Sequence, residues 1–158
     1  MDKKRVFSFL LAGLLTSSVL LLSCKKDKAQ DPPVQPSTAI EVTYSVPQVN
    51  AIIATKITYT DGDNKPIVVE NATMPWTKKI QANAPFTATL KIENSLIPNI
   101  EIPDMITLGS GYTISCSGAL EDTQAFSSSM TIKKEQLDKW LTRPAKEYSH
   151  TFTIEDKQ

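Results

Sequence analysis

Cys116 and His150 are the side chains of this sequence that could act together as a nucleophile and its base. His150 is the single histidine, and both residues lie in the apolar register of alternating segments. An activated thiol needs a neighbouring base, so a thiol enzyme would have to bring these two residues together. A lone inward cysteine is more often a small core residue, and a lone histidine a hydrogen-bonded structural one. We therefore predict no catalytic residue and keep the thiol enzyme as a third hypothesis.

The segment Asp61-Gly62-Asp63-Asn64 offers carboxylates at the spacing of a calcium loop. An EF-hand loop also needs an oxygen ligand where Lys65 stands and a glutamate where the chain has Ala72. The same residues are typical of a hairpin turn in which Gly62 or Asn64 takes a positive φ. We predict the turn, no metal site and no cofactor, because one histidine and two cysteines are also too few for a usual zinc site.

Cys24 follows the three parts of an export signal. A basic segment, Lys3-Lys4-Arg5, precedes an apolar stretch over residues 6–22, which is the pattern of a secretory signal. The residues Leu21-Leu22-Ser23-Cys24 resemble the lipobox of bacterial lipoproteins. That resemblance implies cleavage between Ser23 and Cys24 and attachment of acyl chains such as palmitate to Cys24. The alternative is an uncleaved membrane helix, for which the apolar stretch is at the lower limit of length.

The sequence divides into a signal peptide at 1–23, a lipidated cysteine with a flexible tether at 24–38, and a domain at 39–158. The tether has three prolines and no large apolar residue except Val34, so it cannot pack a core. Its 14 residues after Cys24 could hold the domain up to roughly 40 Å from the lipid. Its first residues, Lys25-Lys26-Asp27-Lys28, are similar to charged stretches in lipoproteins of the Bacteroidota. We expect a lipid anchor at the outer membrane, facing the periplasm or the cell surface.

The balance of basic and acidic residues excludes a protein that binds nucleic acid through a basic surface. The 158 residues include 17 basic and 17 acidic side chains, and the signal holds three of the basic ones and one of the acidic ones. The remaining chain therefore has 14 basic and 16 acidic side chains. A protein that binds nucleic acid through phosphate contacts needs a basic surface.

A period of two dominates from Ala39 onward. Four segments alternate apolar and polar residues, which is the pattern of half-buried antiparallel strands, and three less regular segments also suit strands. Turn residues at short intervals and the lack of a strand–helix–strand rhythm favour an all-β, immunoglobulin-like antiparallel sandwich of about seven strands. The regular segments are 40–46, 86–92, 112–117 and 148–154; the others are 52–60, 67–70 and 77–82; turns are expected at 47–48, 61–64, 83–85, 98–99 and 109–111.

The segment Lys133–Leu141 is the exception to the strand pattern. Leu137, Trp140 and Leu141 are spaced as on one face of a helix, with charged residues between them. Arg143 precedes a proline, which disfavours a further helical turn. We predict one short amphipathic helix near the C-terminus, placed at one end of the sandwich because a helix this short has little stability alone.

Several stretches of the domain are similar to the MmpS family, the small membrane proteins of mycobacteria. Those proteins show a V-x-Y-E-V opening, an I-x-Y-x-D strand end, an L-P-W motif and a later I-x-C strand. The matching stretches keep the family's order within residues 40–123. They are Val42-Thr43-Tyr44-Ser45-Val46, Ile57-Thr58-Tyr59-Thr60-Asp61, Met74-Pro75-Trp76-Thr77, Pro85-Phe86-Thr87-Ala88 and Tyr112-Thr113-Ile114-Ser115-Cys116.

The resemblance implies an immunoglobulin-like sandwich outside the cytoplasmic membrane. In the family it also implies an accessory role beside a large RND-type transporter. The chain departs from the family in its cleaved lipoprotein signal, where MmpS proteins keep a membrane helix. Residues 133–158 also lack a counterpart in the family. We therefore expect this chain to share the family's fold more readily than its partnership with a transporter, because one fold supports many functions.

The sequence as a whole indicates a membrane-anchored domain that binds or scaffolds and does not catalyse. Two hypotheses follow: an accessory subunit of an envelope transport system, and a surface module that binds glycan or protein. The candidate ligand platforms are Trp76 and Trp140. Trp76 precedes a strand, where a tryptophan usually covers core, whereas Trp140 on the helix could belong to an exposed binding face. Membrane lipid and an envelope protein are the expected partners, and the sequence does not specify an oligomeric state.

Overall fold

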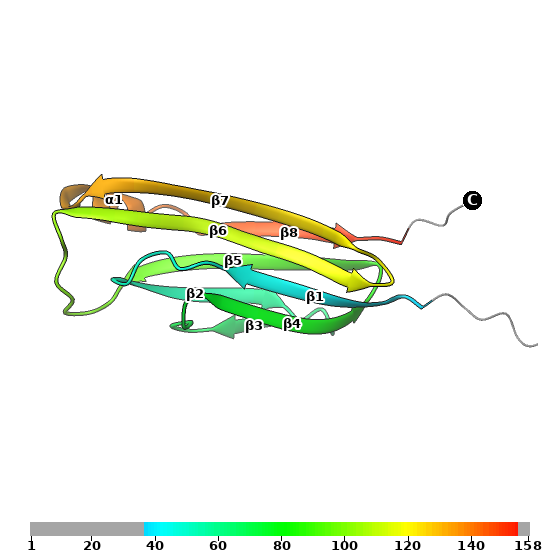
Figure 1. The fold of residues 1–158 in the computed structure, drawn as a ribbon. Coiled ribbons are helices and arrows are strands. Elements are labelled where there is room, and N and C mark those ends of the chain that lie inside the picture. The colour runs from blue at the N-terminus through cyan, green and yellow to red at the C-terminus, as the bar shows by residue number, and fades with distance from the viewer. Residues whose placement is uncertain (1–36, 155–158) are drawn as a thin grey trace, which may run out of the picture. The chain divides into compact units, whose positions relative to one another are not determined.

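Two antiparallel four-stranded sheets make up the domain in the computed structural model, which describes residues 37–154. One sheet has the order β4-β1-β6-β7, and the other has the order β3-β2-β5-β8 (Figure 1). A single 3₁₀ turn, Lys134–Gln136, leads into helix α1, Leu137–Leu141. The strands are β1 Ala39–Val46, β2 Ile53–Thr60, β3 Pro66–Val69, β4 Trp76–Asn83, β5 Phe86–Leu96, β6 Met105–Gly118, β7 Asp122–Lys133 and β8 Lys146–Phe152.

The strand order matches that of an immunoglobulin sandwich in one sheet and in part of the other. Immunoglobulin domains place strands A, B and E in one sheet and C′, C, F and G in the other. Here β1 and β4 take the places of B and E, and β3, β2, β5 and β8 take those of C′, C, F and G. The place of strand A, beside β1, is taken by β6, and β7 lies outside it. The predicted all-β sandwich with one short C-terminal helix is confirmed, with eight strands in the described residues and not about seven.

Alternation of apolar and polar residues explains why these segments form strands. In β1, residues at every second position are buried and the intervening ones are half-buried or exposed. The same alternation continues along the first half of β5. Because successive side chains of a strand point to opposite faces, one face of each sheet enters the core between the sheets. Each large apolar side chain buried there contributes about 1.5–3 kcal/mol.

Tyr44 shows how polar groups are accommodated in this core. Its side chain is fully buried, and its hydroxyl donates a 2.8 Å hydrogen bond to the backbone oxygen of Thr60. Burial raises the pKa of the Tyr44 phenol, so the group stays neutral and remains a donor. The ring also lies 5.4 Å from that of Tyr59, between centroids. The bond satisfies the one polar atom of a residue at the centre of the sandwich.

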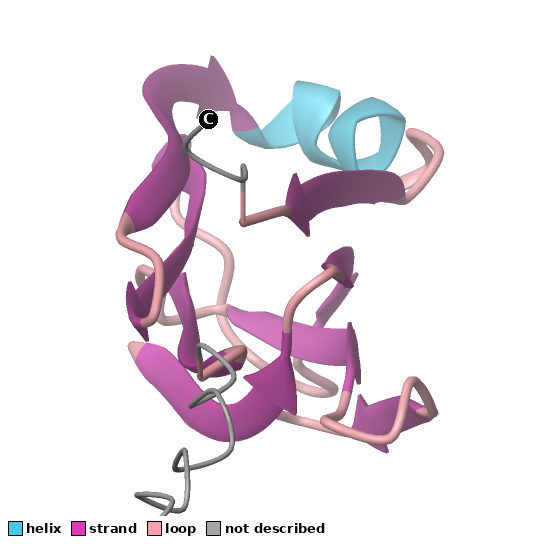
Figure 2. Cartoon of the chain, turned by 90° about the vertical axis from the view of Figure 1, so that its right-hand side faces the viewer, coloured by secondary structure: helices cyan, strands magenta, loops and turns pink. Residues whose placement is uncertain are grey.

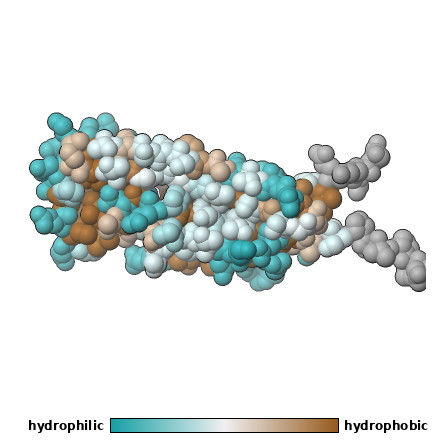
Figure 3. Space-filling view, viewed as in Figure 1, coloured by the Kyte–Doolittle hydropathy of each residue, from teal (hydrophilic) through white to brown (hydrophobic). Residues whose placement is uncertain are grey.

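The core has two clusters, one along the middle of the sandwich and one at the end where α1 lies. Leu137 of α1 is buried in the second cluster together with Ile106, Leu108 and Ile132. The helix therefore closes one end of the sandwich, as its apolar spacing predicts. Figure 2 looks along the strands and shows α1 and the following strand β8 on the same side of the domain. Figure 3 shows apolar surface at the end of the domain near α1.

The prediction of a turn at Gly109-Ser110-Gly111 is wrong, because these residues lie within β6. The glycines serve close approach of neighbouring backbone. A Cβ on Gly109 would lie 2.8 Å from the oxygen of Gln48, and one on Gly111 would lie 2.7 Å from the oxygen of Phe126. The amide of Gly109 also donates to the oxygen of Val49 at 2.8 Å. A glycine inside a strand often marks such an approach.

The turn predicted at Asp61–Asn64 is confirmed. Asn64 has a φ of 60°, the left-handed conformation expected for one of its residues. One carboxylate oxygen of Asp61 accepts hydrogen bonds from the backbone amides of Asp63, at 3.0 Å, and Lys65, at 2.8 Å. The Asp63 carboxylate lies 3.5 Å from the Lys65 ammonium. Both carboxylates therefore serve the turn, and residues 37–154 contain no cluster of three or more metal-ligating side chains.

Candidate ligand-binding cavity

The predicted lipid site lies outside the described residues. Ser23, Cys24, the signal peptide and most of the tether precede residue 37, where the description of the structure begins. Within residues 37–154 no helix is both long and apolar enough to cross a membrane. The anchor at Cys24 therefore stays a prediction from the sequence.

Cys116 and His150 have different partners. The thiol of Cys116 is 6% exposed and donates to the backbone oxygen of Leu120 at 3.5 Å, and burial raises its pKa. A thiol in this state is a poor source of the thiolate that nucleophilic catalysis requires. The hydrogen bonds of the described residues do not include one between this thiol and the His150 ring. The arrangement favours the structural interpretation of both residues.

His150 forms a contact between the two sheets. Its Nε2 lies 2.7 Å from Oδ2 of Asp122, which joins β8 of one sheet to the start of β7 in the other. The hydrogen bond from His150 holds the pKa of the Asp122 carboxyl below its usual range. Asp122 is also the residue opposite Cys116 in the β6–β7 register. His150 is thus hydrogen-bonded to a carboxylate on the strand next to Cys116, and the third hypothesis, a Cys116–His150 pair, gains no contact from the described residues.

Trp76 lies at the start of β4, opposite Val46 of β1. Its ring centroid is 5.5 Å from that of Tyr59, and the side chain packs against the central core cluster. Neither cavity found in the described residues is lined by Trp76. These contacts agree with a tryptophan that covers core and do not present it as a ligand platform.

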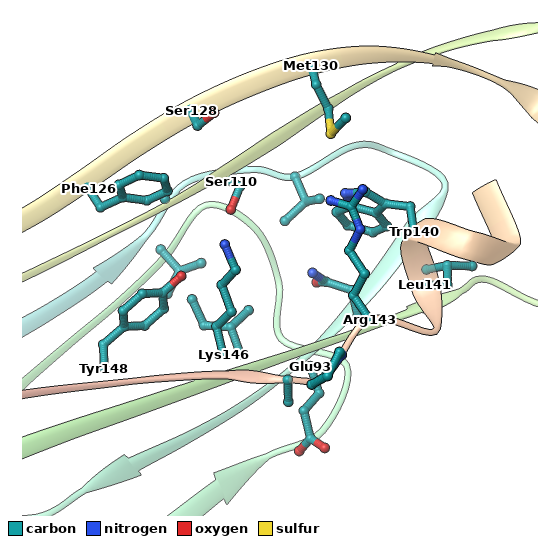
Figure 4. A pocket seen from close by; sticks show the side chains of 17 residues that line it. Glu93, Ser110, Phe126, Ser128, Met130, Trp140, Leu141, Arg143, Lys146 and Tyr148 are labelled. Carbon is teal, nitrogen blue, oxygen red and sulfur yellow. The ribbon is translucent and has the colours of Figure 1, made fainter. Parts of the chain in front are cut away.

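Trp140 lines a cavity of about 310 Å³ on the open side of the sandwich, between β7 of one sheet and β8 of the other. The strands β7 and β8 are the outer strands of their sheets on this side, and α1 lies at one end of the cavity. Figure 4 shows Phe126 and Met130 reaching into the space from β7, with Trp140 and Leu141 facing them from α1. A concave site with mostly apolar and aromatic walls is the usual form of a small-molecule site.

Aromatic rings form one wall of this cavity. The rings of Tyr112 and Tyr148 stack with centroids 3.8 Å apart, and Phe126, the cross-strand partner of Tyr112, stacks with Tyr112 at 6.5 Å. Tyr148 is half-buried, and burial together with the Tyr112 phenol raises its pKa. Its hydroxyl therefore remains protonated and available as a hydrogen-bond donor near neutral pH. The stack fixes the Tyr148 side chain, so this wall is formed before any ligand binds.

Two cationic side chains enter the cavity, Arg143 from the loop after α1 and Lys146 from the first position of β8. Figure 4 shows Arg143 and Lys146 pointing into the space, whereas the carboxylate of Glu93 points away from it. Glu93 instead pairs with Lys91 at 3.3 Å and with Lys56 at 3.9 Å. The Lys146 ammonium lies 5.8 Å from the centroid of the Phe126 ring. In the described part of the chain, neither Arg143 nor Lys146 forms an ion pair.

A second hollow, of about 620 Å³, lies beside the Asp61 turn and has a different character. Its walls include Lys78, Lys79 and Gln81 of the edge strand β4, and Tyr59 is its one aromatic residue. The Lys79 ammonium is already paired with Glu41 at 2.6 Å. The first cavity has more aromatic residues, and its two cations form no ion pair with the described part of the chain, so it is the stronger candidate despite its smaller volume.

Sequence reasoning identified Trp140 but missed the other functional residues of this cavity. Phe126 and Met130 lie on β7, which was not predicted as a strand. The signal that could have found them is the spacing of Phe126, Met130 and Ile132 at even positions of one segment. Arg143 lies in the loop after α1 and Lys146 begins β8, and nothing in the local sequence shows that the two side chains enter a cavity beside β7.

Comparison with known proteins adds no assignment. No protein-family model matches the chain, and no curated protein matches it significantly. The likeness to MmpS proteins therefore rests on the motifs within residues 40–123.

Proposed function

We propose that this chain is a lipid-anchored binding protein of the bacterial cell envelope. Its domain holds a small anionic ligand with an apolar body in the cavity between β7 and β8. The observation that carries the proposal is that aromatic walls and two cationic side chains, Arg143 and Lys146, line the same cavity. Neither cation forms an ion pair within residues 37–154. The proposal assigns no bond-making step to the domain.

The charge of the ligand follows from Arg143 and Lys146. Both side chains point into the cavity and bring positive charge to it, which favours a ligand of opposite charge. Glu93, the one acidic residue of the lining, is engaged by two lysines on the outer face. A carboxylate or phosphate at the mouth of the cavity would accept hydrogen bonds from both cations. The hydroxyls of Ser110 and Ser128 lie on the opposite wall and supply further polar contacts.

The body of the ligand follows from the walls. Trp140, Phe126 and Tyr148 offer ring faces, and Met130 and Leu141 add aliphatic surface. Aromatic side chains contribute large contact areas to binding sites. The volume of about 310 Å³ is at the lower end of the range for ligand cavities. A molecule with a single ring or a short chain, and one acidic group, fits these dimensions.

The anchor is supported by the residues around Cys24. A basic segment, an apolar stretch and Leu-Leu-Ser ahead of the cysteine together form the pattern that directs lipid attachment. Several acyl chains supply stable membrane attachment, because each buried methylene contributes about 0.8 kcal/mol. The tether over 24–38 would then present the cavity beside the membrane. An accessory role at a transporter, as the MmpS resemblance implies, is compatible with such a binding domain and remains a prediction.

A matched pair of probes tests the cavity. The acid 3-phenylpropanoate should bind, and its neutral amide should bind more weakly, because the two differ in charge and share the ring. Arg143→Gln and Lys146→Gln should each weaken binding of the acid about fivefold, which corresponds to about 1 kcal/mol for a charge contact at an exposed site. Neither variant should change binding of the amide. Calorimetric titration of the purified protein measures these affinities.

The control variants are Lys134→Gln and Lys139→Gln, which remove the same charge outside the cavity. Both residues are exposed and neither lines the cavity. Equal weakening by control and cavity variants would indicate nonspecific attraction and contradict the proposal. Glucuronate and glucose form a second matched pair. Binding of glucuronate without binding of the phenyl acid would favour the glycan-binding alternative at the same cations.

A further inference from the structure

The outer edge of β7 is the surface from which a second inference follows. We propose that two copies of this chain pair antiparallel through β7, with Ser127 opposite Ser127 of the second copy. The four-stranded sheet β4-β1-β6-β7 would then continue across both copies. The proposal concerns an interface and does not depend on the ligand of the cavity.

The strand β7 lacks the features that normally protect a sheet edge. It pairs with β6 on one side and with no strand of the described residues on the other. It runs for 12 residues, of which all but Gln124 and Ile132 are exposed. Residues 123–132 include no charged residue and no proline. A long, uncharged edge with free backbone donors and acceptors is a template for a further strand.

The other three edge strands carry such protection. The strand β3 has four residues and begins with Pro66. The edge β4 has two lysines, Lys78 and Lys79, among its eight residues. The edge β8 has Lys146 and Glu147 among its seven. Charged residues, proline and short length are the usual means of blocking edge pairing. In β7 charged residues stand only at the two ends, Asp122 and Lys133, and the ten residues between them have neither charge nor proline, which sets this edge apart.

The inner face of β7 is complementary to itself in the proposed register. With Ser127 at the centre, each Phe126 lies opposite Ser128 of the second copy. The diagonal neighbours of Phe126 are then Phe126 and Met130 of the second copy, within reach of an aromatic side chain. Phe126 and Met130 are 43% and 39% exposed in the single chain. Pairing would gather four exposed apolar side chains on one face and remove them from water.

The ends of the same register are complementary in charge. Glu121, directly before β7, would lie opposite Lys133 of the second copy, and the symmetric contact repeats at the other end. Both side chains are exposed, and neither forms an ion pair within residues 37–154. Opposite charges that face each other across two strands stabilise that register. Registers that place like charges opposite each other are disfavoured. This complementarity of a strand to itself favours a second copy over an unrelated strand as the occupant.

A disulfide test reports the register directly. In membranes from cells that express the full chain, Ser127→Cys should give a species of twice the mass after mild oxidation, and a reductant should remove it. Directly paired residues bring their Cα atoms within disulfide range. Thr131→Cys, the control, would lie opposite Thr123 and should give at least about tenfold less dimer. Thr123→Cys and Thr131→Cys chains that carry different tags should instead link to each other when expressed together.

Mass measurements in detergent supply a second readout. The full chain should have the mass of a dimer, and Ser127→Lys should reduce it to that of a monomer, whereas Gln81→Lys on the β4 edge should leave it unchanged. The proposal is overturned by a monomeric wild-type chain, by equal cross-linking of Thr131→Cys and Ser127→Cys, or by cross-links of Ser127→Cys to other proteins alone. A dimer that persists in Ser127→Lys would also contradict it, because the interface would then lie elsewhere.

Discussion

Replacement of Phe152 by alanine is expected to lower the free energy of unfolding by about 3–5 kcal/mol. Phe152 is 0% exposed and ends β8, opposite Phe86 of β5. Its removal would leave a cavity at the centre of the main core cluster, where neighbouring side chains cannot collapse fully. A typical domain is stable by about 5–15 kcal/mol, so the loss is a large share of the total.

Met105→Ala is the control for this prediction. A large apolar side chain is again shortened to a methyl group, here at a residue that is 56% exposed at the start of β6, so the loss should not exceed about 1 kcal/mol. Urea unfolding of the unacylated chain, followed by fluorescence, measures both variants. Equal losses in the two variants would show that β8 does not complete the core.

Replacement of Cys24 by alanine is expected to abolish incorporation of labelled palmitate. The thiol of Cys24 is the proposed site of lipid attachment, so no acylated product can form without it. Cys116→Ala is the control, because Cys116 is buried between the sheets and should leave the label unchanged. Metabolic labelling followed by gel electrophoresis measures both variants. Label retained in Cys24→Ala, or absent from the wild-type chain, would contradict the lipoprotein assignment.

The strands whose alternation was most regular in the sequence are those whose two faces differ in polarity. In β1 and the first half of β5, apolar residues alternate with polar ones because one face is core and the other is solvent. The strand β7 has no such contrast, since Gln124 and Ser128 stand on its inner face among Phe126 and Met130. Polar residues are tolerated on this face because β7 lies at the edge of its sheet, beyond the second sheet. The same residues interrupt the alternation that would predict a strand.

The candidate site was less predictable than the fold, because its residues come from elements distant in the sequence. The sequence made Trp140 a candidate because it is an aromatic residue on a short predicted helix. The residues that line the cavity with it include residues of β6, β7 and β8. The sequence predicted a structural, hydrogen-bonded His150 and left a pair with Cys116 as the less favoured hypothesis. The structure gives it Asp122, the cross-strand partner of Cys116. The contact between His150 and Asp122 depends on the register of β6 and β7, which places Asp122 opposite Cys116. Residue types alone do not predict that register.

The most direct test of the proposed function uses the two tryptophans as reporters. A ¹⁵N-labelled chain has two indole N–H signals, from Trp76 and Trp140, and Trp140→Phe assigns them. Trp140 lines the cavity, and Trp76 packs on Tyr59 outside it. Titration with 3-phenylpropanoate should shift the Trp140 signal in a saturable way and leave the Trp76 signal in place. An unmoved Trp140 signal, or equal shifts of both signals, would contradict a binding site between β7 and β8.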